Sequence, residues 1–230
     1  MLKGREIAPL VLLCLAASLT IVFASIAENV LQGDLTDFDH AVFLALRHSA
    51  NPSEPLGPHW LQVAARDVTS LGSPAVLTLV TAVSLGVLAL KRQWGAALFI
   101  LASVCSGSAL GFSLKALLQR ARPDLAAEAV AETQTYSFPS GHAFLSAVTY
   151  LTLGALLAKM EPQPAVKVYI LAVAIAIALM VGVSRVYLGV HWPTDVLAGW
   201  CAGAAWAVLC VLIAERMRAM PLPPWTAGPA

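Results

Sequence analysis

Residues 168–195 read VYILAVAIAIALMVGVSRVYLGVHWPTD, and they place charged and titratable side chains at the end of a long apolar run. The run from Val168 to Val183 contains no charged residue, which is typical of a transmembrane helix. Arg185, His191 and Asp195 follow it. Because charge at the end of a hydrophobic segment is costly, this arrangement favours a functional site. The alternative is an interfacial salt bridge between Arg185 and Asp195 that only fixes a loop.

The spacing of His191 and Asp195 indicates a catalytic pair. If the chain is helical there, four residues put the carboxylate one turn from the imidazole, where it can accept the ring N–H. This hydrogen bond would fix the tautomer and leave the other nitrogen free to attack or to accept a proton. Arg185 adds a fixed fork of donors suited to phosphate.

The composition indicates an all-α, polytopic membrane protein with a single domain. Of 230 residues, 59% are hydrophobic and 12% are charged, against about 25% charged in soluble domains. The mean hydropathy is +0.77. A net charge of +1 provides no basic stripe for nucleic acid, so that class of partner is excluded. The cysteines show neither zinc-ligand spacing nor a disulfide framework and are interpreted as packing residues: Cys14, Cys105, Cys201 and Cys210.

Six apolar segments are each about long enough to cross a bilayer core, which needs roughly 20 residues. They cover about 7–26, 73–90, 95–118, 142–158, 165–184 and 193–214. Ala24–Ala27 resembles a weak cleavage site, but the length of the first segment favours a retained helix over a secretory signal. Ser73 and Pro74 predict an N-cap followed by proline at the first helical position. The domain is expected to span 1–218, and the proline-rich tail, 219–230, is expected to be disordered.

The more polar segment between the first two spans predicts two short amphipathic helices on the outer side, separated by residues 51–55. Thr36 and Asp39 suggest a capping box before the first of them. The segment's histidines are interpreted as surface or capping residues rather than metal ligands: His40, His48 and His59. Whether region 34–72 covers a site or only lies in the membrane interface stays open.

Lysine and arginine in the linkers predict the orientation. When six spans are threaded, one side carries Lys3, Arg5, Lys91, Arg92, Lys159, Lys167, Arg216 and Arg218. The positive-inside rule makes that side the cytoplasm, with both termini there. The polar segments 27–73, 119–141 and 185–193 then share the outer face.

Three polar blocks fall on that face. They are Lys115-x6-Arg122-Pro123, Pro139-Ser140-Gly141-His142 and Ser184-Arg185-x5-His191-x3-Asp195. The cations at these helix ends outnumber nearby acids, since the second loop carries only Asp124, Glu128 and Glu132. Such a cluster suits a dianionic phosphate group.

A serine and a glycine at a helix start add backbone N–H groups that can cradle an anion. An ordinary N-cap at Ser140 and a snorkelling Lys115 are the alternatives, but neither explains why all these groups share a face.

Two histidines supply the remaining chemistry. Breaking a phosphate ester without a metal needs a nucleophile and a proton donor for the leaving alkoxide. His191, backed by Asp195, is the candidate nucleophile, and His142 is the candidate acid. The sequence contains no carboxylate cluster suited to magnesium and no histidine and cysteine ligand set, so neither metal nor cofactor is expected. Cationic side chains would meet the phosphoryl charge instead.

The eleven residues named in the three blocks, in this order and membrane context, resemble the type 2 phosphatidic acid phosphatase superfamily, the lipid phosphate phosphatases. The resemblance covers roughly residues 34–213 and implies a six-helix membrane phosphatase that works without metal. It implies that His191 forms a phosphohistidine held by Asp195, while His142 protonates the departing lipid and later activates water. It assigns phosphate binding to Lys115, Arg122, Ser140, Gly141 and Arg185.

The resulting prediction is a lipid phosphate or diphosphate phosphatase whose site faces the outer leaflet of the bacterial inner membrane. Undecaprenyl diphosphate, phosphatidylglycerophosphate and phosphatidic acid are the candidate substrates. Two alternatives remain: a phosphotransferase that passes the phosphoryl group to another lipid, and an anionic-lipid binding or transport protein. The sequence leaves the oligomeric state open. Three aromatic residues are possible head-group or tail contacts or interface anchors: Trp60, Tyr136 and Phe138.

Overall fold

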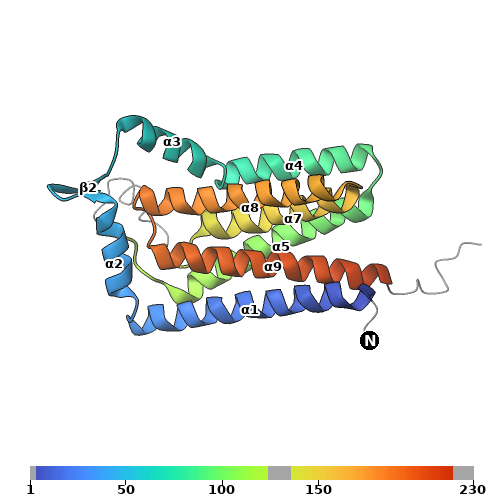
Figure 1. The fold of residues 1–230 in the computed structure, drawn as a ribbon, viewed down its shortest axis with the longest axis horizontal. Coiled ribbons are helices and arrows are strands. Elements are labelled where there is room, and N and C mark those ends of the chain that lie inside the picture. Colours follow the sequence, from blue (N-terminus) through green and yellow to red (C-terminus); the bar gives the residue numbers. More distant parts are fainter. Residues whose placement is uncertain (1–3, 124–135, 220–230) are drawn as a thin grey trace, which may run out of the picture.

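A computed structural model describes residues 4–123 and 136–219 (Figure 1). Its helices are α1 (Gly4–Gln32), α2 (Thr36–Ala45), α3 (His59–Ser70), α4 (Pro74–Leu90), α5 (Trp94–Leu118), α7 (Gly141–Met160), α8 (Pro164–Tyr187) and α9 (Pro193–Ala219). A small antiparallel hairpin, β1 (Arg47–His48) and β2 (Asn51–Pro55), separates α2 from α3. The three acids expected in the second loop and most of the expected tail lie outside the described residues.

The spans agree with the sequence. Within the described residues, five helices are long and apolar enough to cross a membrane: α1, α5, α7, α8 and α9. The sixth is α4 taken together with α3, from which it departs by a bend of 47°. Ser73 caps α4 as expected, because its side chain accepts a hydrogen bond from the Val76 N–H at 3.3 Å. The chain is therefore an all-α, multi-pass membrane protein.

The central helix is α7, which packs against α5, α8 and α9, while α1 packs along α9. Two glycines allow α9 to lie directly on the first half of α7. A Cβ atom at Gly199 would lie 2.8 Å from the Ser140 carbonyl oxygen, and one at Gly203 would lie 2.5 Å from the Phe144 carbonyl oxygen. The same contact joins the two helix starts, since the Ser140 N–H donates to the Asp195 carbonyl at 2.9 Å.

The two ends of the bundle differ in character (Figure 1). At one end the ends of α7 and α9 are joined by Lys159 and Glu215, whose side chains lie 3.2 Å apart. The turn between α4 and α5 and the start of α1 lie at this end. At the other end α2 packs on the start of α9, Arg47 of the hairpin binds the Tyr187 carbonyl at the end of α8, and the three polar blocks of the sequence meet there.

Three local expectations are wrong. Thr36 and Asp39 form no capping box, because α2 begins at Thr36 and its N-cap, Leu35, makes no side-chain cap hydrogen bond. Phe138 is no interface anchor, since it is fully buried and stacks on Phe23 with 6.1 Å between ring centroids. Two of the four free cysteines are exposed on the helix surfaces rather than packed inside: Cys14 and Cys105.

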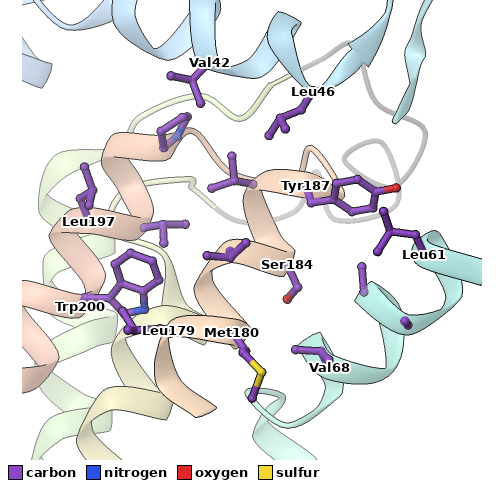
Figure 2. A pocket seen from close by; sticks show the side chains of 16 residues that line it. Val42, Leu46, Leu61, Val68, Leu179, Met180, Ser184, Tyr187, Leu197 and Trp200 are labelled. Atoms are coloured by element: carbon purple, nitrogen blue, oxygen red, sulfur yellow. The ribbon is translucent and has the colours of Figure 1, made fainter. Parts of the chain in front are cut away.

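An apolar cavity of about 600 Å³ lies between α2, α3, α8 and α9 (Figure 2). Its walls include Leu46, Leu61, Met180, Leu197 and Trp200. Of the described motif residues only Ser184 contributes to the lining, and no charged side chain does. The cavity is therefore separate from the cluster of polar motif side chains, although α2 and the start of α9 border both.

Candidate active site

The predicted site residues come from four places that the fold brings together. Lys115 lies in the last turn of α5 and Arg122 follows that helix; Ser140, Gly141 and His142 begin α7; Arg185 lies in the last turn of α8. His191 stands between α8 and α9, and Asp195 lies in the first turn of α9. Their convergence is electrostatic as well as geometric. The charges of Arg185, Arg122, Lys115 and His142 all act on the His191 imidazole.

The His191 ring is 1% exposed and is contacted on both nitrogens. Its Nδ1 lies 3.4 Å from Asp195 Oδ2 and 3.3 Å from Ser137 Oγ. Its Nε2 lies 3.2 Å from Arg122 Nη1, which also donates to the Val190 carbonyl at 2.8 Å. The Asp195 side of the ring is therefore held, while Nε2 faces a cation suited to phosphate.

Burial, followed by the neighbouring Arg185, Arg122, Lys115 and His142, lowers the pKa of His191 well below its ordinary value. Both causes disfavour the imidazolium, because a cation is poorly solvated inside the protein and is repelled by like charges. The ring is consequently neutral at physiological pH. A neutral imidazole has the lone pair that nucleophilic attack requires.

The predicted pairing of Asp195 with His191 is present, but Asp195 has further partners. Its Oδ2 accepts from the Trp192 N–H at 2.9 Å and from the Ser137 hydroxyl, and its Oδ1 accepts from Arg120 Nη1 at 2.7 Å. The contact to Trp192 resembles the return half of a capping box at the start of α9. The alternative pairing of Asp195 with Arg185 does not occur: the Arg185 fork reaches Thr69 of α3, at 3.5 Å.

The start of α7 has the features of an anion site. Ser140 is its N-cap residue and is fully buried, yet its hydroxyl has no hydrogen-bond partner among the described residues. Lys115 reaches across this helix start, because a Cβ atom on Gly141 would lie only 3.3 Å from Lys115 Cε. The Lys115 ammonium donates to the Tyr136 carbonyl at 2.7 Å. Helix N–H groups, a buried hydroxyl and a lysine together suit a phosphoryl group.

Sequence reasoning missed four residues that contact the site. Ser137 touches both His191 and Asp195, and Arg120 binds the second oxygen of Asp195. Asp39 and Thr194 complete the same network. Ser137 and Arg120 lie two residues from the motif positions Pro139 and Arg122, and Thr194 directly precedes Asp195; this closeness to the motif is the signal that the sequence offered. Asp39 lies more than 70 residues from every motif position.

No three His, Cys, Asp or Glu side chains gather as a metal-ligand set in the described part of the chain. The absence of a metal requirement stays a prediction.

Comparisons with known proteins agree with the motif. Residues 96–218 match the PAP2 superfamily. The chain is 35% identical over 148 residues to phosphatidylglycerophosphatase B of Bacillus subtilis, covering 63% of this chain and 70% of that protein. It is 40% identical over 78 residues to undecaprenyl-diphosphatase of Sulfolobus acidocaldarius, covering 34% of each. The solved structure of the first transmembrane PAP2-type phosphatidylglycerolphosphate phosphatase from Bacillus subtilis superposes with a TM-score of 0.80 at 28% identity, covering 90% of this chain and 98% of that one. The chain belongs to the PAP2 superfamily and is an integral-membrane lipid phosphatase.

Proposed function

We propose that the protein hydrolyses a lipid phosphate or diphosphate without a metal, through a phosphohistidine at His191. The observation that carries the proposal is the environment of this ring, which is buried, neutral and held at Nδ1 while Nε2 faces Arg122. A binding or transport protein would need the cations but not a histidine with a backing carboxylate.

In the first step Nε2 of His191 attacks phosphorus, and the bond from phosphorus to the lipid oxygen breaks. His142, protonated, gives its proton to the departing oxygen, which is otherwise a poor leaving group. Lys115, Arg122 and Arg185 meet the charge on the phosphoryl oxygens, together with the hydroxyl and N–H groups that begin α7. The carboxylate of Asp195 stabilises the charge that the imidazole gains when its Nε2 is phosphorylated.

In the second step His142, now neutral, takes a proton from water. The resulting hydroxide attacks phosphorus, the bond to Nε2 breaks, and inorganic phosphate leaves. His191 returns neutral and His142 returns protonated, so protons and charge balance over the cycle. A phosphotransferase would use the same first step and would differ only in admitting a lipid hydroxyl in place of water.

Among the three candidate lipids, phosphatidylglycerophosphate has the most support. A relative that is 35% identical over 148 residues and the solved structure with the TM-score of 0.80 are both named for that reaction. Undecaprenyl diphosphate is supported by the shorter match. Phosphatidic acid has the same phosphomonoester and serves as the comparison without a glycerol head group.

Phosphate release from the purified protein in detergent, with chelator present, tests this function. We expect release from at least one of the three lipids, undiminished by the chelator, with phosphatidylglycerophosphate the fastest. Activity that disappears with chelator and returns with a divalent cation would contradict the mechanism. Adding an acceptor lipid separates the alternatives, because transfer would yield a newly phosphorylated lipid in place of free phosphate.

We place the site on the periplasmic side and both termini in the cytoplasm of a bacterial inner membrane, on the strength of the basic linkers. A cysteine-free variant carrying Glu54→Cys in the hairpin should react with a membrane-impermeant maleimide in spheroplasts. The matched variant Lys91→Cys, exposed at the opposite end of the bundle, should react only after permeabilisation. The reverse pattern would show that the site faces the cytoplasm.

A further inference from the structure

Asp39 and Arg120 form a buried ion pair that connects α2 to the catalytic carboxylate. The two terminal nitrogens of Arg120 contact two different acids: Nη2 lies 2.6 Å from Asp39 Oδ2, and Nη1 lies 2.7 Å from Asp195 Oδ1. The side chains of both acids are fully buried, and that of Arg120 is 16% exposed. One guanidinium therefore binds two carboxylates and offsets part of the cost of burying their charges.

Thr194 fixes the relative position of these groups. Its hydroxyl accepts from Arg120 Nη1 at 2.8 Å and donates to Asp39 Oδ2 at 2.6 Å. Its backbone N–H donates to Asp39 Oδ1 at 2.9 Å. Thr194 is in the first turn of α9, where N–H groups lack helical partners, so Asp39 caps this helix from a distant part of the chain.

These contacts determine the orientation of the Asp195 carboxylate relative to the His191 imidazole. Its Oδ2 faces His191 Nδ1, while Arg120 holds Oδ1. A carboxylate bound at both oxygens cannot turn about its last side-chain bond, so the oxygen facing His191 stays in place. Loss of the Arg120 contact would leave only the Oδ2 oxygen held, by the Trp192 N–H and the Ser137 hydroxyl, and would loosen the orientation of the carboxylate and of the ring.

We infer that Asp39 and Arg120 are positioning residues, which hold Asp195 and, through it, the nucleophile His191. Helix α2, which carries Asp39, therefore contributes to the orientation of the catalytic groups. The inference rests on the proposed function. Arg120 and Asp39 are not among the eleven motif positions, and Asp39 lies outside residues 96–218, where the superfamily match falls. The proposal gives the outer amphipathic segment a role that neither the motif nor the family match supplies.

The test is a double-mutant cycle on kcat and KM for phosphate release by the full-length protein. Asp39→Asn keeps the shape of the side chain but removes its charge. We expect kcat to fall about 10- to 100-fold, as for a small misplacement of a reacting group, with KM within about twofold because Asp39 does not contact phosphate. Asp37→Asn, an exposed acid on the same helix, should leave both constants unchanged.

In an Asp195→Asn background, Asp39→Asn should cause no further loss, since its effect passes through Asp195. Equal losses in both backgrounds, or no loss in either, would overturn the proposal. Thr194→Val, which removes only the bridging hydroxyl, should lower kcat in the same direction by a smaller factor, and it decides the matter if Asp39→Asn does not fold. Failure of the proposed function would show separately, as a wild-type protein that releases no phosphate.

Discussion

Replacing His191 with alanine will reduce kcat/KM for lipid phosphate hydrolysis by roughly 10⁴-fold or more, as expected when a covalent nucleophile is removed. The phosphate-binding groups remain, so the variant should still bind substrate or inorganic phosphate. The decisive measurement is transfer of labelled phosphate from the substrate to the protein. Wild-type protein should carry an acid-labile, base-stable label, which is the behaviour of phosphohistidine, and the variant should carry none.

The matched control is His59→Ala, which removes an exposed histidine from α3, away from the motif residues. It should be labelled and should turn over like the wild type. Label that persists in His191→Ala would show that another group is the nucleophile, and Asp195 would then have no phosphorylated imidazole to stabilise.

Replacing His142 with glutamine will separate the two chemical steps. With a lipid substrate, kcat should fall about 10²- to 10⁴-fold, the usual contribution of a general acid or base. With p-nitrophenyl phosphate the leaving group needs no proton, so His191 should still be phosphorylated. Because water is no longer activated, the phosphoenzyme should accumulate. Its formation should appear as a burst of released nitrophenolate close to one equivalent per protein.

His48→Gln is the control for this second prediction, since His48 is an exposed residue of the hairpin. It should show steady turnover with both substrates. A His142→Gln protein that loses the burst together with steady turnover would mean that His142 acts on binding or on the nucleophile, rather than on the leaving group and water.

The arrangement of the helices was largely predictable because it depends on local patterns. Long apolar runs predict transmembrane spans. A capping serine followed by proline at Ser73-Pro74, and the polar, proline-containing turn at Lys159–Pro164, predict helix ends from local sequence alone. The contact between His191 and Asp195 was predictable for the same reason, since the two residues are one helical turn apart. The hairpin was not, because nothing in residues 47–55 alternates as a strand pair would.

The rest of the site depends on contacts between distant parts of the chain. Arg120 meets Asp195 across 75 residues, and Asp39 meets Thr194 across 155. No periodicity connects such positions, and Asp39 also had a plausible local explanation as a capping residue. Phe138 was misplaced for a similar reason: an aromatic residue beside a polar block suits an interface, but here packing against residues of α1, α5 and α9 buries it.

The place of His191 between the last two helices has a consequence for biogenesis. Every residue proposed to bind phosphate precedes it in the chain, and so do the proposed acid His142 and the pair Asp39 and Arg120. A nascent chain that has left the ribosome as far as α8 thus carries the proposed anion site without the proposed nucleophile. Synthesis and membrane insertion of α9 bring Asp195 to Arg120, so the proposed chemistry would become available only after α9 is in place.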